Sequence, residues 1–93
     1  MILDFGSKET EKIWQGDRVR KWSIDFQIIS RRKLRMLNNS QNLADLKIPP
    51  SNRLEKLTGK LRDHCIIRIN KQWRIVFIWH DGNATDVKII DYH

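Results

Sequence analysis

The spacing of hydrophobic positions changes near the middle of the chain. Between residues 7 and 46 apolar side chains recur every three or four positions, which is the period of an α-helix. From residue 65 onward apolar and polar side chains alternate, which is the period of a β-strand. We therefore expect helices in the N-terminal half and a strand meander in the C-terminal half.

Capping residues predict two helices in the first half. Ser7 precedes a helix expected over residues 8–14, which Gly16 ends. Ser23 precedes a longer helix expected over residues 24–37, which Asn38-Asn39 ends.

The remaining signals of the N-terminal half are weaker. The apolar stripe expected on the long helix comprises Phe26, Ile29, Leu34 and Leu37, and Arg31, Arg32, Lys33 and Arg35 cover the rest. Ser40 is expected to cap a short turn, and Pro49-Pro50 is expected to force an extended link. Residues 1–5 alternate weakly and predict a short strand.

Three strands are predicted in the second half, over residues 65–69, 73–80 and 85–92. Asn70-Lys71 predicts a tight turn because Asn tolerates positive φ, and Asp81-Gly82 is a strong hairpin signal. Residues 53–57 add a short extended piece. This order predicts an α+β fold, a small twisted antiparallel sheet with two to three helices packed on one face, and 93 residues predict a single domain over positions 1–93.

Strand alternation puts two arginines on one side of this sheet. On the 73–80 strand, Trp73, Ile75, Phe77 and Trp79 form a core face, so Arg74 points to the opposite face. Arg68 points the same way as Ile66 on the preceding strand. The sequence leaves the pairing register open, and the two guanidinium groups are expected to form a cationic floor.

The charge of the chain points to a polyanionic partner. Eighteen Lys and Arg against eleven Asp and Glu give a net charge of +7. Residues 18–36 hold seven of these bases and residues 51–74 hold another seven. Such concentration is typical of nucleic-acid binding. A solvated basic surface is the alternative.

Other functional classes find little support. A single cysteine, Cys65, excludes an internal disulfide and a cysteine-based zinc cluster, so a cytoplasmic location is expected. The longest apolar run, residues 75–79, has five residues, and the N-terminus lacks the features of a secretory signal, so we expect no membrane association. No serine lies in a nucleophile motif, no glycine-rich phosphate loop is present, and no metal-ligand spacing is found.

Basic residues and the end of the chain are the remaining candidates for chemistry. RNA carries its own nucleophile, the 2′-hydroxyl, so RNA cleavage needs only positioning, charge stabilisation and proton transfer. His93 can transfer a proton, and Tyr92 can stack on a base or donate a hydrogen bond. The residues expected to hold the phosphate are Arg74, Arg68, Lys60 and Arg62.

Each candidate also has a purely structural interpretation. Arg74 could pair with Asp91 across the sheet, and a terminal Tyr-His can be incidental. His64 and His80 are expected at the surface.

Several segments together resemble the HigB toxins of bacterial toxin–antitoxin pairs, within the RelE/ParE-like group. The similarity spans the chain, and its most specific parts are Asn52-Arg-Leu-Glu-Lys-Leu-Thr-Gly59, Ile67-Arg-Ile-Asn-Lys-Gln-Trp-Arg-Ile75 and the closing Val87-x-Ile-x-Asp-Tyr-His93. The resemblance implies a cytoplasmic, metal-independent endoribonuclease that cuts mRNA in the ribosomal A site and leaves a 2′,3′-cyclic phosphate. It also implies a HigA-type helix-turn-helix antitoxin, through which the pair binds operator DNA.

The resemblance assigns roles by position. His93 matches a terminal histidine that transfers a proton or orients substrate, and Tyr92 would position the nucleotide. Arg74 is the first choice for phosphate stabilisation and Arg68 the second.

One departure from the family pattern concerns the basic side chains that could serve in catalysis. Relatives often have Lys where Thr58 stands and some have His where Glu55 stands. Lys60 or Lys56 could replace the lost cation, and Glu55 could accept a proton. Weakened cleavage is the alternative.

Two other functions stay open at this stage. A ParE-like toxin poisons gyrase on the same fold, and a basic module can bind nucleic acid without cutting it. Removing Tyr92 and His93 distinguishes them, because only RNA cleavage should be lost.

Overall fold

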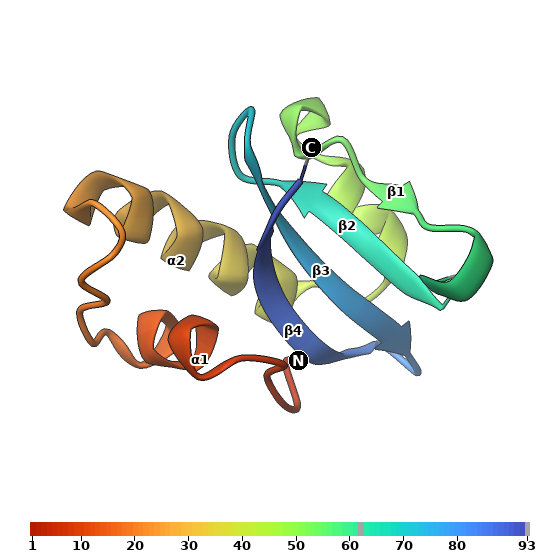
Figure 1. Ribbon diagram of the computed structural model, residues 1–93. Coiled ribbons are helices and arrows are strands. Elements are labelled where there is room, and N and C mark those ends of the chain that lie inside the picture. Colours follow the sequence, from red (N-terminus) through yellow and green to blue (C-terminus); the bar gives the residue numbers. More distant parts are fainter. Residues whose placement is uncertain (62, 93) are drawn as a thin grey trace.

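A computed structural model describes residues 1–61 and 63–92, although the side chain of Leu61 is not described. In this part of the chain two α-helices pack against a four-stranded antiparallel sheet of order β1-β2-β3-β4 (Figure 1). The elements are α1 Lys8–Gln15, α2 Ile24–Asn39, β1 Glu55–Lys56, β2 His64–Arg68, β3 Trp73–His80 and β4 Asn83–Asp91, with short 3-10 turns at Leu43–Lys47, Pro50–Asn52 and Gly59–Leu61. The predicted α+β fold is confirmed.

Both predicted helix starts are confirmed by their caps. The Ser7 hydroxyl accepts a hydrogen bond from the Thr10 N–H at 3.2 Å, and the Ser23 hydroxyl accepts one from Phe26 at 3.1 Å. Gly16 ends α1 in the left-handed region at φ 89°. The end predicted for α2 was early, because the helix continues through Asn39.

The predicted buried stripe of α2 is partly wrong. Ile29 is 40% exposed, whereas Gln27 is only 4% exposed and Ser30 is fully buried. The Gln27 amide accepts from the Val19 N–H at 2.8 Å and donates to the carbonyls of Val19 and Trp22 at 3.1 and 2.9 Å. A buried polar side chain is favoured here because the loop between the helices presents backbone groups that need partners.

Two predicted connections also differ. Asn42, not Ser40, precedes the 3-10 turn at Leu43–Lys47, and the Ser40 hydroxyl instead donates to the Met36 carbonyl at 2.8 Å. Pro50 begins a second 3-10 turn rather than continuing an extended link, because the fixed φ of proline suits the first position of a helical turn.

The N-terminal residues do not form a full strand. Ile2 and Phe5 make single parallel bridges to Ala84 and Val87 of β4. The predicted strand is therefore reduced to two isolated bridges, whose backbone hydrogen bonds tie the start of the chain to β4 (Figure 1).

The hairpins of the meander use different turn chemistry. Asp81 and Gly82 both have positive φ, 51° and 78°, as the predicted β3–β4 turn requires. At the β2–β3 turn, by contrast, the Asn70 side chain accepts hydrogen bonds from the N–H groups of Gln72 and Trp73, both at 2.9 Å. The turn at Asn70 is confirmed, but its reason is a side-chain acceptor and not positive φ.

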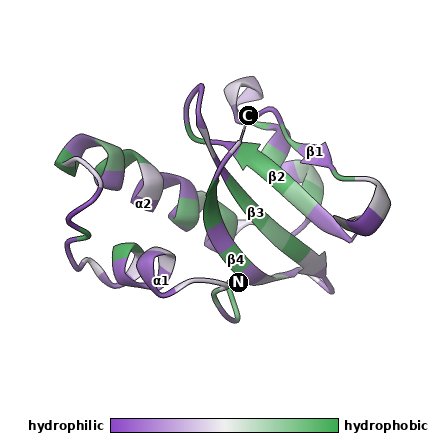
Figure 2. Cartoon of the chain, viewed as in Figure 1, coloured by the Kyte–Doolittle hydropathy of each residue, from purple (hydrophilic) through white to green (hydrophobic). Residues whose placement is uncertain are grey.

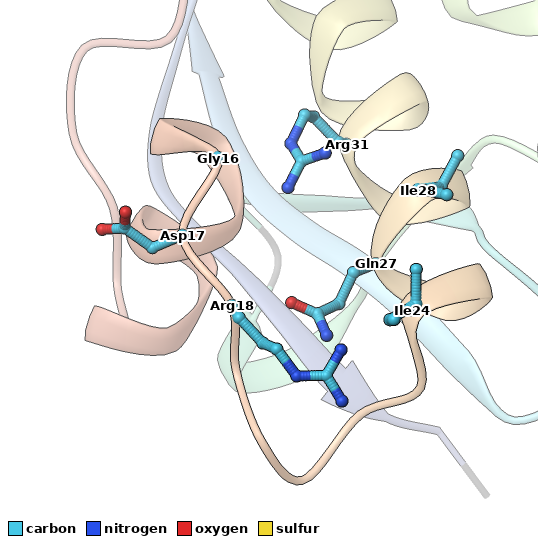
Figure 3. Close-up of a pocket in the computed structure, with 7 residues that line it drawn as sticks. All are labelled: Gly16, Asp17, Arg18, Ile24, Gln27, Ile28 and Arg31. Atoms are coloured by element: carbon cyan, nitrogen blue, oxygen red, sulfur yellow. The ribbon is translucent and has the colours of Figure 1, made fainter.

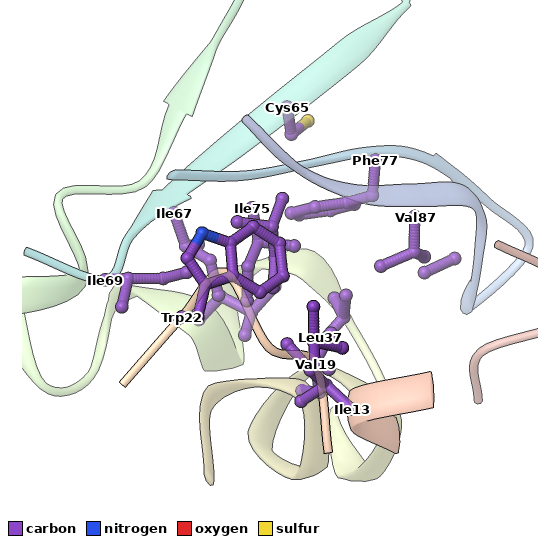
Figure 4. Close-up of a cluster of buried hydrophobic side chains, with 14 residues drawn as sticks. Ile13, Val19, Trp22, Leu37, Cys65, Ile67, Ile69, Ile75, Phe77 and Val87 are labelled. Carbon is purple, nitrogen blue, oxygen red and sulfur yellow. The ribbon is translucent and has the colours of Figure 1, made fainter. Parts of the chain in front are cut away.

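The core lies between the helices and one face of the sheet (Figure 4). Ile75 and Phe77 are fully buried there, as predicted, and Trp73 and Trp79 pack at its edges. The other core residues are Ile13, Val19, Trp22, Leu34, Leu37, Leu46, Cys65, Ile67, Ile69, Ala84, Val87 and Ile89. Figure 2 shows hydrophobic residues concentrated along β2 and β3, whereas β1 is hydrophilic.

Among the described residues no helix is long and apolar enough to span a bilayer.

Candidate functional site

The two strand arginines face each other on the side of the sheet opposite the core. The register pairs Arg68 of β2 directly with Arg74 of β3, and each lies one residue from a core position, Ile67 or Ile75. Directly opposed side chains on one face of a sheet have Cβ atoms about 5 Å apart. The cationic pair expected from the sequence is thus formed by the register.

The β2–β3 turn holds the guanidinium of Arg74. Its Nη1 atom donates to the carbonyl of Asn70 and to the carbonyl of Trp73 at 3.1 Å. The Asn70 side chain in turn accepts from two N–H groups of the same turn. The arginine is therefore fixed by backbone acceptors and leaves other N–H donors for a ligand.

Tyr92 lies against this arginine. The Arg74 guanidinium carbon is 5.1 Å from the Tyr92 ring centroid, within the range of a cation–π contact. The Tyr92 N–H donates to the Gln72 carbonyl at 2.7 Å, and the side chain is 38% exposed. Tyr92 and Arg74, distant in sequence, form one surface with a cation and an accessible aromatic ring.

The register does not favour the ion pair between Arg74 and Asp91 that the sequence allowed. The register places Asp91 opposite Trp73 and Arg74 opposite Ile90, so the two charged residues belong to opposite faces. The Asp91 carboxylate accepts a hydrogen bond from the Gln72 Nε2 at 3.0 Å.

The β1 strand separates two candidates that are adjacent in sequence. Glu55 pairs with Ile66 and therefore shares the face of Arg68 and Arg74. Lys56 pairs with Cys65 and belongs to the opposite face. The expectation that Lys56 could support the site thus conflicts with the register, while the placement of Glu55 agrees with a role there.

The remaining candidates have no described contact with the arginine pair. Lys60 is exposed in the 3-10 turn Gly59–Leu61, and Thr58 is exposed just before it. Arg62 and His93 lie outside the described residues, so their predicted roles remain predictions.

The two other histidines differ in exposure. His80 is exposed, as expected, and its Nε2 lies 3.2 Å from the Asp81 carboxylate. The expectation for His64 was wrong, because its side chain is 16% exposed, its Nδ1 is buried and its Nε2 lies 3.5 Å from the Asp86 carboxylate. His64 begins β2 one position before Cys65, so the packing of the strand covers it.

Cys65 behaves as the buried thiol that the sequence predicts. It is 2% exposed, and burial raises the pKa of the thiol, an effect that the nearby Lys56 charge only partly opposes. A protonated, enclosed thiol is a poor nucleophile.

Sequence reasoning missed the residues that position the site. Asn70 and Gln72 were considered only as turn and motif residues, yet they hold the loop, Arg74 and Tyr92 together. The available signal was the conjunction of a turn-forming Asn with an arginine four residues later.

The arrangement can bind an oxyanion and stack a planar group. Like charges placed opposite each other on a sheet repel, so a bound phosphate would relieve the repulsion between Arg68 and Arg74. An exposed aromatic ring offers a surface to a nucleobase. Within residues 1–61 and 63–92 no cluster of His, Cys, Asp and Glu is arranged to hold a metal ion.

Comparison with known proteins identifies a family model and related sequences. The model, described as the RelE-like toxin of the type II toxin–antitoxin system HigB, matches residues 3–93. Toxin HigB-1 of Vibrio cholerae serotype O1 is 41% identical over 87 residues, which cover 90% of this chain and 90% of that protein. An uncharacterized protein of Haemophilus influenzae is 33% identical over 72 residues, which cover 77% of this chain and 71% of that protein.

Solved structures provide a likeness of fold. The crystal structure of a YafQ mutant from E. coli has a TM-score of 0.65 at 13% identity, over 98% of this chain and 91% of that one. YafQ from E. coli strain BL21(DE3) has a TM-score of 0.62 at 12% identity, with the same coverage. At such low identity the likeness concerns the fold alone.

Proposed function

This chain belongs to the HigB-like family of RelE-like toxins of type II toxin–antitoxin systems, and we propose that it is a ribosome-dependent endoribonuclease that cuts mRNA. Membership of this family makes an antitoxin its partner. We further propose that this antitoxin is of the HigA helix-turn-helix type, that the pair reaches operator DNA through the antitoxin, and that the toxin acts in the cytoplasm.

One structural relationship carries the proposal. Arg68 and Arg74 oppose each other across β2 and β3, and the Tyr92 ring lies against Arg74. Two guanidinium groups can hold the non-bridging oxygens of a phosphodiester and stabilise the charge that develops as its phosphorus becomes five-coordinate. The Tyr92 ring would hold the adjacent base.

The proposed cleavage uses the substrate's own nucleophile. A base removes the proton of the 2′-hydroxyl, the 2′-oxygen attacks phosphorus, and the 5′-oxygen leaves with a proton from an acid. The products are a 2′,3′-cyclic phosphate and a free 5′-hydroxyl, so the reaction needs no metal ion. We assign the proton transfers to His93 and Glu55, the latter because β1 places it on the face of the arginine pair.

The surrounding bases have smaller proposed roles. Lys60 is exposed in the 3-10 turn Gly59–Leu61 and, with Arg62, would attract the RNA backbone. Lys56 would contribute only at long range, because it belongs to the other face. Thr58 stands where relatives often carry a lysine, so we expect slower cleavage than a lysine would allow.

The first experiment is a cleavage assay on translating ribosomes. Removing Tyr92 and His93, or replacing Arg74 with Ala, should abolish cuts mapped by primer extension, whereas Arg20→Ala, an exposed arginine in the loop before α2, should leave them. Chelation of divalent ions after the toxin has bound the ribosome should leave the cleavage of mRNA by the toxin intact.

Other results would reject the proposal. Loss of supercoiling by purified gyrase in the presence of the truncated protein would support a ParE-like poison instead. Unchanged binding of RNA without any cleavage by the wild-type chain would support a non-catalytic module.

A further inference from the structure

A surface at the start of α2, which includes neither Arg68 nor Arg74, combines exposed aliphatic side chains with arginines. It is an open pocket between the loop after α1 and the first turns of α2, and its lining includes Arg18, Ile24, Ile28 and Arg31 (Figure 3). Ile24 is 58% exposed and Ile28 is 46% exposed. We define the docking stripe as these four residues together with Arg35.

The periodicity of α2 explains why these side chains are adjacent. Ile24, Ile28, Arg31 and Arg35 follow at intervals of four, three and four residues, so they lie along one line of the helix. Leu34 and Leu37 belong to the neighbouring buried line. The stripe therefore borders the core without contributing to it.

Hydrogen bonds join the three segments that form the pocket, α1, the loop after it and α2. The Arg31 Nε donates to the Ile13 carbonyl at 2.8 Å, which anchors α2 to the end of α1. The buried Gln27 amide fixes the loop at Val19 and Trp22. These hydrogen bonds connect α1, the loop and α2 around the groove.

We propose that the docking stripe binds the antitoxin, through a segment that carries aliphatic side chains followed by carboxylates. Exposed isoleucines gain free energy by contact with other aliphatic side chains, and the arginines at Arg18, Arg31 and Arg35 complement acidic residues. The family supplies the partner, because a type II toxin has an antitoxin. The inference does not depend on RNA cleavage.

Nucleic acid is a poorer occupant of this groove. Single strands are held by aromatic stacking surfaces, and no aromatic residue lines the pocket in the described chain. Exposed aliphatic side chains provide neither a stacking surface nor a hydrogen bond for a nucleic acid, whereas they can pack against the apolar face of a helix.

The test is calorimetric titration of the purified toxin with its cognate antitoxin. Ile24→Ala with Ile28→Ala should weaken binding by about a hundredfold, and Arg35→Glu by about tenfold. The matched control is Ile48→Ala, which removes an equally apolar side chain that is 74% exposed elsewhere. Thermal unfolding should show that all variants fold, because the changed side chains lie outside the core.

A growth assay separates this inference from the proposed nuclease. The double isoleucine variant should still cleave mRNA, yet co-expressed antitoxin should no longer neutralise it. Wild-type antitoxin affinity in this variant would overturn the inference. The inference would also be overturned if the variant lost ribosome binding but kept its affinity for the antitoxin. The same holds if the substitutions dissociated a dimer of the free toxin while the variant still bound antitoxin normally.

Discussion

The Arg74 guanidinium carbon lies 5.1 Å from the centre of the Tyr92 ring, so the end of β4 is held against the start of β3. The β2–β3 turn reinforces this contact, because the Asn70 carbonyl accepts a hydrogen bond from the Arg74 guanidinium and the Gln72 carbonyl accepts one from the Tyr92 N–H. A cation and an aromatic ring with 38% exposure are thereby presented together.

Arg74 is expected to be required for cleavage because of its geometry as well as its charge. Arg74→Ala should lower the cleavage rate by about 10²–10³-fold, the usual effect of losing one donor to a developing negative charge. Arg74→Lys should recover only part of the rate, since an ammonium cannot donate in a fork. Single-turnover cleavage on programmed ribosomes measures both; equal rates for Arg74→Ala and the wild type would exclude Arg74 from the site.

The Tyr92 ring should matter more than its hydroxyl. Tyr92→Phe keeps the surface against Arg74 and should retain the cleavage rate within a few fold. Tyr92→Ala should lower substrate affinity by about tenfold, because stacking contributes roughly 1–3 kcal/mol per base. Titration of the mRNA–ribosome complex reads this difference. A large loss in Tyr92→Phe would instead assign the hydroxyl to proton transfer.

Asn70 should act as a positioning residue. Asn70→Ala removes the acceptor for the Gln72 and Trp73 N–H groups and should cost about 1 kcal/mol of unfolding free energy. It should also slow cleavage, whereas Asn70→Asp keeps an acceptor oxygen and should restore both. Urea unfolding and the cleavage assay are run on the same preparations, and rescue of stability without rescue of cleavage would argue against a positioning role.

Gln27 should be a major contributor to stability. Its replacement by Met leaves the Val19 N–H and the Trp22 carbonyl without a partner inside the protein, whereas the Val19 carbonyl keeps its hydrogen bond from the Trp22 N–H at 3.2 Å. Buried groups left in this way cost about 1–3 kcal/mol each, so the free energy of unfolding should fall by about 2–4 kcal/mol. Ile29→Met on the same helix is the control, and it should change stability by less than about 0.5 kcal/mol since that side chain is exposed.

Cys65 should make the protein less stable at alkaline pH. Burial raises the pKa of the thiol in the folded state, so the unfolded thiol loses its proton at a lower pH than the folded one. The folded state binds more protons in that window, and stability therefore falls as the pH rises above about 8.5. Urea unfolding between pH 7 and 10 should give a difference in unfolding free energy between the wild type and Cys65→Ala. This difference should narrow only at the alkaline end of the range. A constant gap would mean that the thiol does not titrate differently on folding.

Local sequence signals determined the elements and most of their ends. Ser7, Ser23 and Gly16 act within one turn of themselves, and the alternation in β3 needs only neighbouring residues. The same alternation placed Arg68 and Arg74 on the side away from the core, and the motifs near them indicated the family.

The tertiary structure decided what depends on residues far apart in the chain. The strands pair in a register that sets Arg68 opposite Arg74 and puts Glu55, but not Lys56, on their face. The alternation within each strand leaves this register open. Gln27 is buried because the loop before α2 presents backbone groups that need a polar partner, a requirement that hydrophobic periodicity does not reveal. The contact of Tyr92 with Arg74 likewise exists only once β4 pairs with β3, because side-chain contacts follow from packing across the sheet and not from sequence spacing.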